Sequence, residues 1–325
     1  MTDSKNLPAI DCHCHFISQE YYKVLEENNR LFDDSFPVPN SYSPESHLED
    51  MEKVGIDVSI LDLSSPNFWV DIEQGRSMAR KINEYAAGIC QKYPGKFGFY
   101  ATLPLPDIEG SLRELEYAYD VLNADGVRFY TNASGLYLGQ PEMDSIFEEM
   151  NHRKAVMTYH PTRPVIPENV LEGVPVPLFE FHFDSCRAVA NLIFKDVFGR
   201  YPNIKFVVTH LGGLLPLFAD RIMLIANVLA SQGDSAVFSA PPDIFGLLKS
   251  FYYDFGGGAG LPVQIPALRY ISDTSHWLYG SDYPFTNAVS AVKLGQSLRN
   301  TPHLTDDELA GVLRNNALEL FPRFK

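Results

Sequence analysis

Eight short apolar segments recur along the 325-residue chain, and amphipathic helical patterns separate most of them. Residues 76–93, 111–124 and 184–201 carry apolar side chains at the i, i+3 and i+4 spacing of a helix with one buried face. Alternation of strand and helix favours parallel strands, and eight such units favour a closed (β/α)8 TIM barrel over an open doubly wound sheet. The predicted strands are 8–16, 56–64, 96–104, 125–131, 155–161, 204–212, 251–257 and 277–285.

We expect residues 1–325 to form this barrel as a single domain. The chain shows no internal repeat, low-complexity tract or interdomain linker. Barrels routinely reach this length as one unit. Apolar residues make up 45% of the chain and charged residues 21%, which fits a soluble protein with a large core.

Two long connections interrupt the alternation. Residues 28–44 follow the first predicted strand, and the proline-rich residues 161–183 follow the fifth. Connections of this kind lie on the catalytic face of a barrel, so both are candidate lids or pocket walls. The alternative is that they are ordinary surface elaborations.

The charge excludes several classes of partner. A net charge of -15 repels nucleic acid and anionic membranes, although one bound cation can still attract an anionic substrate into a pocket. No signal peptide and no run of 18 apolar residues is visible, so we predict a cytoplasmic protein with no membrane partner. Four scattered cysteines agree with reduced thiols. Cys12 and Cys14 suggest a zinc site, but no second cysteine pair completes one.

Ionisable residues stand at the ends of several predicted strands. His13 and His15 lie two apart, so their side chains point to the same face and can hold one metal ion. His160, His210 and Asp282 follow the fifth, sixth and eighth apolar runs. The carboxyl ends of barrel strands meet at one face, where these residues supply enough ligands for one catalytic zinc or manganese ion.

The other histidines carry less weight. His152, His276 and His303 lie in helical or loop contexts and are predicted to be solvated. His182 belongs to the connection 161–183, and we expect it not to reach the pocket.

Several motifs together resemble the amidohydrolase superfamily. They are D-x-H-x-H at 11–15, H-P at 160–161, T-H-x-G-G at 209–213 and G-S-D-Y-P-F at 280–285. The resemblance is strongest to its decarboxylase branch, which includes the aminocarboxymuconate-semialdehyde, γ-resorcylate and 6-methylsalicylate decarboxylases. Residues 137–156 are most similar to the 6-methylsalicylate type.

This resemblance implies specific roles. It makes metal ligands of His13, His15, His160 and Asp282, and it makes His210 the catalytic histidine beside them. It also suggests a homodimer or homotetramer, with residues 214–231 as one possible contact.

One difference from the decarboxylase branch limits the class of substrate. Enzymes of the muconate-semialdehyde type carry an arginine for the substrate carboxylate in the helix before the second strand, where this chain has His47. They carry another in an R-P-P segment, where this chain reads Ala240-Pro241-Pro242. Both differences argue against that substrate.

The fourth predicted strand bears on the number of metal ions. Two-metal hydrolases of the superfamily often use a carboxylated lysine there, whereas the only cation of this strand is Arg128. A one-metal site is therefore favoured, which leaves a lactonase-like one-metal hydrolase as the alternative to a decarboxylase. A metal-binding barrel without catalytic activity is a third interpretation.

A non-oxidative decarboxylase of a small ortho-hydroxy aromatic acid needs no organic cofactor. The metal ion holds the carboxylate and the ortho oxygen, and a nearby acid protonates the ring carbon. We assign that acid to Asp282, with His210 assisting. Trp69, Tyr283 and Phe285 are candidate pocket walls, and His47, Arg128 and Arg163 are candidate substrate contacts, although core packing or surface charge explains each equally well.

Overall fold

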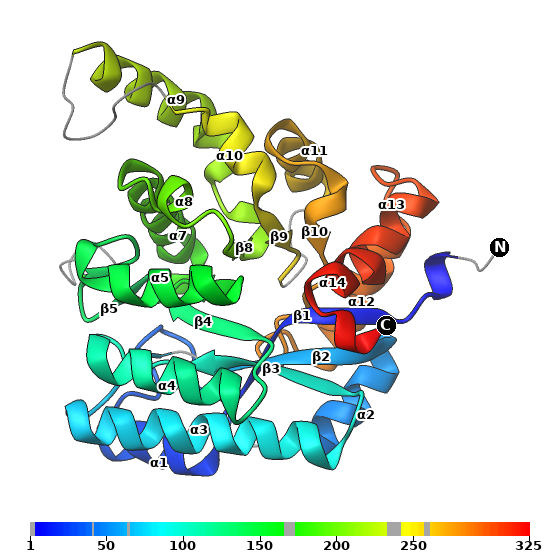
Figure 1. Cartoon of the computed structure of the whole chain (residues 1–325). Coiled ribbons are helices and arrows are strands. Elements are labelled where there is room, and N and C mark those ends of the chain that lie inside the picture. Colours follow the sequence, from blue (N-terminus) through cyan, green and yellow to red (C-terminus); the bar gives the residue numbers. More distant parts are fainter. Residues whose placement is uncertain (1–3, 41, 64–65, 166–172, 233–241, 257–260) are drawn as a thin grey trace.

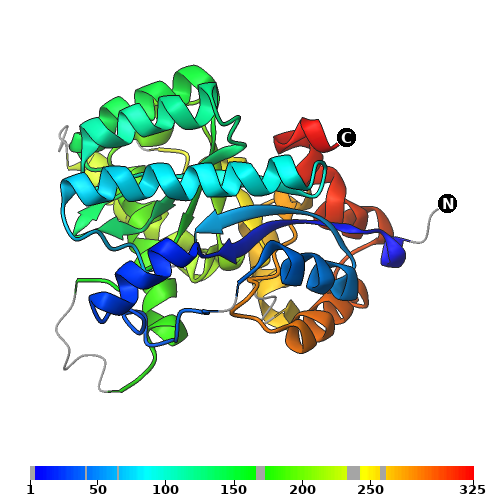
Figure 2. The same ribbon diagram turned by 90° about the horizontal axis from the view of Figure 1, so that it is seen from below.

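The computed structural model describes residues 4–40, 42–63, 66–165, 173–232, 242–256 and 261–325. Eight strands form one sheet in the order β1-β2-β3-β4-β7-β8-β9-β10, and every neighbouring pair in that order is parallel. Figures 1 and 2 show the helices around the outside of these strands. The strands are β1 Ala9–Phe16, β2 Ile56–Leu63, β3 Phe97–Thr102, β4 Gly126–Tyr130, β7 Val156–His160, β8 Lys205–Val208, β9 Tyr252–Asp254 and β10 Trp277–Leu278.

The barrel closes between β1 and the segment that follows β10. Cys14 forms a parallel bridge with Tyr283, and the Cys12 amide donates to the Tyr279 carbonyl at 2.9 Å. The Asp282 amide donates to the His13 carbonyl at 2.8 Å. All eight predicted segments therefore contain a strand, and the predicted (β/α)8 barrel is confirmed. Closure also brings Asp282 beside the histidines of β1.

The helix that follows β7 begins earlier than predicted. Helix α7 spans Val176–Phe194, so its first turns occupy part of the connection that we assigned to 161–183. Proline is tolerated in the first turn of a helix because the first amides have no partner inside the helix. Pro177 stands there, and the proline-rich sequence concealed a helix start.

The connection after β1 also contains a helix. Helix α1, Gln19–Glu27, begins at Ser18, whose hydroxyl accepts a hydrogen bond from the Tyr21 amide. Residues 28–40, 42 and 43 are irregular, and α2, Pro44–Val54, follows them.

The remaining elements complete the outer layer. The amphipathic pattern at 76–93 overlaps α3, Ile72–Lys92, and the pattern at 111–124 overlaps α4, Ile108–Asp120. None of the described helices has the length and apolar character that a membrane crossing requires. The others are α5 Asp144–Arg153, α8 Val197–Arg200, α9 Leu215–Ser231, α10 Ile244–Ser250, α11 Leu261–Ile271, α12 Ala288–Arg299, α13 Asp306–Ala310 and α14 Asn316–Leu320, with a short hairpin of β5 Asn132–Ala133 and β6 Leu136–Tyr137.

Apolar side chains from several strands pack with the C-terminal segment. Ile10, Ile60 and Leu278 belong to one buried cluster with Phe321, in the segment that follows α14. Every residue of β1 is buried, although three of its eight side chains are aspartate or histidine. Burying such groups is costly unless each has a partner, so β1 must meet polar partners.

Candidate metal centre and active site

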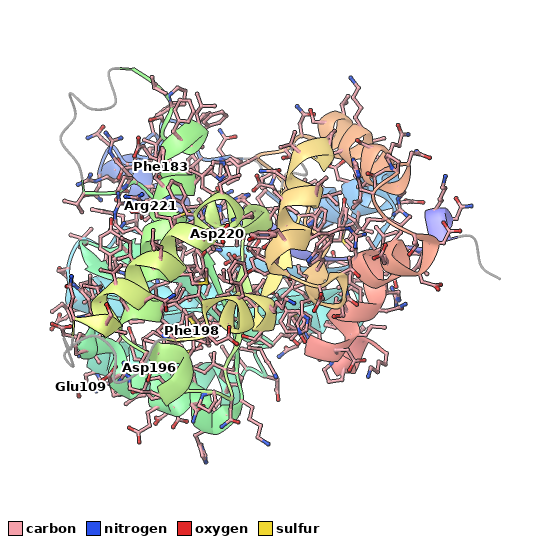
Figure 3. The ribbon with its side chains drawn as sticks, turned by 90° about the horizontal axis from the view of Figure 1, so that it is seen from above. Glu109, Phe183, Asp196, Phe198, Asp220 and Arg221 are labelled. Carbon is pink, nitrogen blue, oxygen red and sulfur yellow. The ribbon has the colours of Figure 1, made fainter. Side chains whose placement is uncertain are left out.

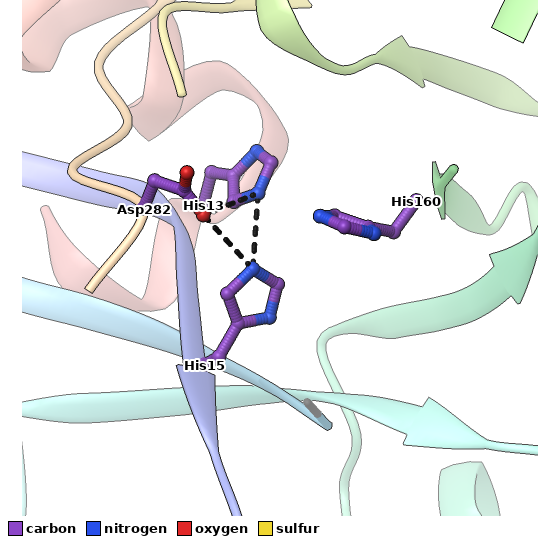
Figure 4. A group of neighbouring side chains, drawn as sticks. All are labelled: His13, His15, His160 and Asp282. Atoms are coloured by element: carbon purple, nitrogen blue, oxygen red, sulfur yellow. Dashed lines mark hydrogen bonds and ion pairs between the residues drawn. The ribbon is translucent and has the colours of Figure 1, made fainter. Parts of the chain in front are cut away.

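Four side chains meet where β1, β7 and the segment after β10 converge (Figure 4). The Nε2 atoms of His13 and His15 lie 3.2 Å apart, and the His15 Nε2 lies 3.2 Å from Oδ1 of Asp282. Figure 4 shows His160 facing these three side chains from the other side. The ligand atoms of His13, His15, His160 and Asp282 all lie within 4.8 Å of one another.

The donor set fits one divalent ion. The His13 Nδ1 donates to the Asp254 carboxylate at 3.0 Å, and the His160 Nδ1 donates to the Pro161 carbonyl at 2.5 Å. Each partner leaves Nε2 as the nitrogen that faces the cluster, as in metal sites whose histidines are oriented from behind. Two ligands of one ion, each about 2.1 Å from it, lie at most about 4.2 Å apart, so binding needs only a small approach of the four atoms.

The protonation states of His15, His160 and Asp282 also suit a cation. Burial lowers the pKa of His15 to about 4 and holds the pKa of His160 well below its usual range, so both are neutral near pH 7. Burial acts to raise the pKa of Asp282, but the hydrogen bond from His15 and the other histidines lower it to about 2. Neutral imidazoles beside a carboxylate are the forms that bind zinc or manganese.

Asp254 supports two of the histidines, and the sequence reasoning missed it. It ends β9, is fully buried, and accepts from the His13 Nδ1. Its Oδ1 also accepts from the backbone amides of His210, at 3.1 Å, and Gly256, at 2.9 Å. The available signal was an acidic residue after an apolar run, the same feature that identified Asp282.

His210 lies beside the four-residue cluster. Its ring centroid is 4.8 Å from that of His13 and 5.3 Å from that of His160. Its Nδ1 lies 3.3 Å from the Gly256 carbonyl, and burial lowers its pKa. His210 has a φ of 54° and Asp282 a φ of 58°, a conformation that costs non-glycine residues about 1–2 kcal/mol each. Such strained positions are concentrated at functional sites.

Asp11, the first residue of D-x-H-x-H, joins β1 to the segment after β10. Its carboxylate accepts from the Ser281 hydroxyl at 2.5 Å and from the amides of Ser281 and His13 at 3.0 and 3.1 Å. Burial raises the pKa of Asp11 to about 7. Asp11 thus holds in place the two segments that carry His13 and Asp282.

Two connected cavities open onto the cluster. The first, which we call the inner cavity, has a volume of about 210 Å³ and is bordered by His160, His210 and Asp282. Phe285, a predicted wall, lines it and packs against the His15 ring at 5.5 Å. Its other lining residues are Asp34, Phe36, Val38, Pro66, Pro177, Phe181 and Thr286.

The second, the side cavity, corrects one expectation. Its volume is about 280 Å³, and it shares His210 and Asp282 with the inner cavity. His182 lines it from α7, with its ring centroid 6.1 Å from that of His210. The expectation that His182 would not reach the pocket is wrong, because α7 begins early and carries this side chain on a helix.

Trp69 and Arg163 lie around a third, larger space, the outer cavity, of about 460 Å³. The Trp69 indole donates to the Leu105 carbonyl at 2.9 Å. The Arg163 guanidinium donates to the Asp33 carbonyl at 2.8 Å. Neither residue borders the inner cavity, so their positions do not support a direct contact with a small substrate at the cluster.

His47 and Arg128 are likewise outside the linings of these three cavities. His47 is buried and stacks on Tyr283 at a ring distance of 4.3 Å, and burial lowers its pKa to about 3. Tyr283 therefore packs in the core rather than forming a pocket wall. Arg128 is buried in an ion pair with Asp62 and donates to the Leu63 carbonyl at 3.3 Å. Their positions indicate packing and charge pairing.

Two smaller groups of expectations remain. His152 is exposed, and His276 and His303 are partly exposed, as predicted. Ala240 and Pro241, which stand in place of the R-P-P arginine and its neighbour, lie outside the described residues.

Comparison with known proteins identifies the same family as the sequence motifs do. Residues 10–323 match the family model described as Amidohydrolase. The chain is 32% identical over 330 residues to decarboxylase macB of Penicillium terrestre, covering 97% of this chain and 95% of that protein. It is 28% identical over 335 residues to the 6-methylsalicylic acid decarboxylase of Penicillium expansum, covering 98% of each.

Solved structures agree on the fold. A structure described as amidohydrolase II superposes with a TM-score of 0.89 at 31% identity and covers 97% of this chain and 99% of that one. The manganese complex of 5-carboxyvanillate decarboxylase from Novosphingobium aromaticivorans superposes with a TM-score of 0.88. At 22% identity, with 98% and 97% of the two chains covered, that second match supports the fold alone.

Proposed function

Because the chain belongs to the amidohydrolase family, we propose that it is a metal-dependent, non-oxidative decarboxylase of a small ortho-hydroxy aromatic acid resembling 6-methylsalicylate. The observation that carries the proposal is the buried cluster of three histidines and one aspartate at the edge of a small aromatic cavity. The curated relatives that match over nearly the whole chain are named as decarboxylases. We propose further that residues 1–325 act as one domain.

We assign the ion to His13, His15, His160 and Asp282, with zinc or manganese as the metal. When bound, the ion supplies Lewis-acid charge for the carboxylate and the ortho oxygen of the substrate. One ion suffices, because β4 contains no lysine and its Arg128 is already paired with Asp62. The manganese complexes of related folds favour manganese as the first metal to test.

The inner cavity suits a single substituted ring. A cavity of about 150 Å³ accommodates benzene, so about 210 Å³ accommodates a benzene ring with a few small substituents. Phe181 and Phe285 form part of its wall, and none of the described residues that line it is a lysine or an arginine. An apolar, water-poor wall favours the loss of a charged carboxylate as neutral carbon dioxide.

Asp282 and His210 are the proposed proton-transfer groups. Decarboxylation requires a proton to reach the ring carbon that carries the carboxylate. Both residues border the inner cavity, and we propose that Asp282 delivers the proton. Because the pKa of Asp282 is only about 2, it must first receive that proton from a close donor. The phenol of the substrate can supply it, either directly or through the His210 ring, which takes the phenolic proton and passes it on.

The test is a panel of hydroxybenzoates incubated with manganese-loaded or zinc-loaded protein while carbon dioxide release is followed. Ortho-hydroxy acids should react and the meta isomers should not, because only the ortho oxygen can accept electron density when the ring carbon is protonated. Reaction in heavy water should place one deuterium on that carbon. Equal turnover of the two isomers would contradict the mechanism. Hydrolysis of lactones without any decarboxylation would instead support the hydrolase alternative.

We also propose a homodimer or homotetramer in the cytoplasm, without nucleic-acid or membrane partners. Helix α9 exposes Leu217, Leu224 and Val228 by 71%, 57% and 41%. A groove between α7 and α9 is lined in part by Phe183 and Arg221 (Figure 3). Light scattering after size-exclusion chromatography measures the mass, and a monomer at micromolar concentration would contradict this part of the proposal.

A further inference from the structure

The side cavity is a part of the site to which the proposed reaction gives no role. It has a volume of about 280 Å³ and shares His210 and Asp282, the two proposed proton-transfer groups, with the inner cavity. His182 and Gln264 also line the side cavity, and neither of them borders the inner cavity. A ligand held beside His210 and Asp282 in the inner cavity therefore lies at the boundary with a second space that has polar groups of its own.

His182 is held at this cavity by its place on α7 and by its contact with the segment after β8. Its ring centroid lies 6.1 Å from that of His210. The ring also lies close to Gly213, where a Cβ atom would be only 3.2 Å from the His182 Nδ1. The glycine at 213 thus gives the ring room to approach the segment that carries His210, and the two histidines lie on the wall of one cavity.

The polar groups that are specific to the side cavity suit an uncharged partner. Burial lowers the pKa of His182 to about 4, and the neighbouring His210 acts in the same direction, so the ring is neutral near pH 7. A neutral imidazole has one nitrogen that donates a hydrogen bond and one that accepts. Gln264, on α11, adds a carboxamide with both a donor and an acceptor. Hydroxyl, carbonyl and amine groups can pair with either side chain.

The volume of the side cavity points to a substituent of several atoms. One water molecule takes up about 30 Å³ of the liquid, far less than this cavity provides. Pro177, Phe181 and Leu211 add apolar surface beside the polar groups. An aromatic acid with its carboxylate at the cluster and its ring in the inner cavity can extend such a substituent past His210 and Asp282.

Resting on the proposed function, we propose that the side cavity binds an uncharged polar substituent of the aromatic acid, and that His182 is the specificity-determining residue that forms a hydrogen bond with it.

The test compares pairs of ortho-hydroxy acids that carry either a hydroxymethyl or an ethyl group at the 3, 4, 5 or 6 position. The two groups have nearly the same size, but only the hydroxymethyl group forms a hydrogen bond. For at least one position, the wild-type protein should prefer the hydroxymethyl acid by about 5-fold or more in kcat/KM, the scale of one hydrogen bond between uncharged groups.

Substitutions of His182 test whether this residue causes the preference. His182→Phe keeps an aromatic ring but removes both nitrogen atoms, so it should abolish or invert the ratio. His182→Gln keeps a donor and an acceptor and should retain part of it. His276→Phe is the matched control, because His276 is a partly exposed histidine that packs against Tyr252 and lines none of the inner, side and outer cavities. The control should keep the wild-type ratio.

Three results would overturn the inference. The first is a wild-type protein without a hydroxymethyl preference at any position. The second is rejection of both members of every pair while the unsubstituted acid binds, which would show that the side cavity takes no substituent. The third is an unchanged ratio in His182→Phe with all acids slowed alike, which would mean that His182 only packs against its neighbours or assists His210. The metal content of each variant checks that the cluster is intact.

Equilibrium binding of the same pairs to manganese-loaded protein separates this inference from the proposed function. If no acid is decarboxylated but the hydroxymethyl preference appears in binding and depends on His182, the proposed function fails and the assignment of His182 stands. If decarboxylation occurs with ratios that do not depend on His182, the proposed function stands and the inference fails.

Discussion

The inner and outer cavities lie next to each other and share Asp34 and Pro66, yet they are built differently. The inner cavity, of about 210 Å³, includes in its lining His160, His210 and Asp282, which lie at or just after the ends of β7, β8 and β10, together with residues of connections and of α7. The outer cavity is more than twice as large, at about 460 Å³, and is lined mostly by residues of the connections between strands and helices.

The comparison shows that the volume of a cavity does not identify the cavity with the candidate catalytic groups. The smaller cavity holds the histidine and aspartate side chains, which backbone hydrogen bonds and buried partners such as Asp254 fix in place. The larger one holds Arg30, which pairs with the Asp33 carboxylate, and Arg163, which donates to the Asp33 carbonyl. Rigid strand ends place catalytic groups more accurately than loops do.

Removal of a proposed ligand should have the largest effect and tests whether the inner cavity is the metal site. His13→Ala and His160→Ala should each reduce the metal content from about one ion per chain to a trace. Supporting residues typically contribute 10–100-fold to metal affinity, and a ligand should contribute more than about 100-fold. Elemental analysis of the purified variants measures this content.

His152→Ala is the control for the ligand variants, since His152 is exposed on α5. It should keep the wild-type metal content. Full occupancy in a His13→Ala, His160→Ala double variant would show that the ion binds elsewhere, and two ions per chain would contradict a one-metal site.

His210→Ala should have the next largest effect on turnover. It tests whether His210 is a catalytic group or a metal ligand. His210 is adjacent to the cluster but is not one of the four proposed ligands. The variant should keep most of its metal and lose turnover by about 10²-fold or more, the usual contribution of acid–base catalysis. Loss of the metal together with turnover would make His210 a ligand and overturn this division.

The strand ends were the part of the molecule that the sequence predicted best. Apolar runs interrupted by His13, His160 or Asp282 are unusual, because a buried ionisable group needs a partner. The barrel then brings all such ends to one face. The fold could therefore be predicted from the periodicity of the apolar segments, and the cluster from the ionisable residues that interrupt those segments.

Apart from Phe285, the cavity walls could not be predicted in the same way. Trp69 and Arg163 follow strands closely, but their side chains turn toward the outer cavity. Asp34 lies in an irregular connection, and its contacts with Thr162 and Arg163 hold it at the inner cavity. Such placement depends on contacts between loops far apart in the chain, which local patterns do not encode.

Asp254→Asn should have an intermediate effect on metal affinity. It tests whether buried hydrogen-bond partners keep the side chains at the strand ends in position. The side-chain oxygen of asparagine can still accept a hydrogen bond. The substitution removes the negative charge that faces His13 and His210. Metal affinity should fall about 10–100-fold, as for other residues that orient ligands from behind. Competition with a metal-sensitive dye measures the affinity. An unchanged affinity with unchanged turnover would show that His13 needs no such support.

Arg163→Ala should have the smallest effect and tests the outer cavity directly. Its guanidinium holds the Asp33 carbonyl, while its backbone amide, which alanine retains, holds Asp34. The inner cavity therefore keeps its shape and charge, and kcat/KM for ortho-hydroxy acids should change by no more than about threefold, the scale of substitutions away from buried networks. Steady-state kinetics on the metal-loaded variant measures this change. A large rise in KM at unchanged kcat and metal content would mean that the guanidinium meets the substrate carboxylate before or during binding. The outer cavity would then be part of the binding site, and the two cavities would differ in position but would both bind the substrate.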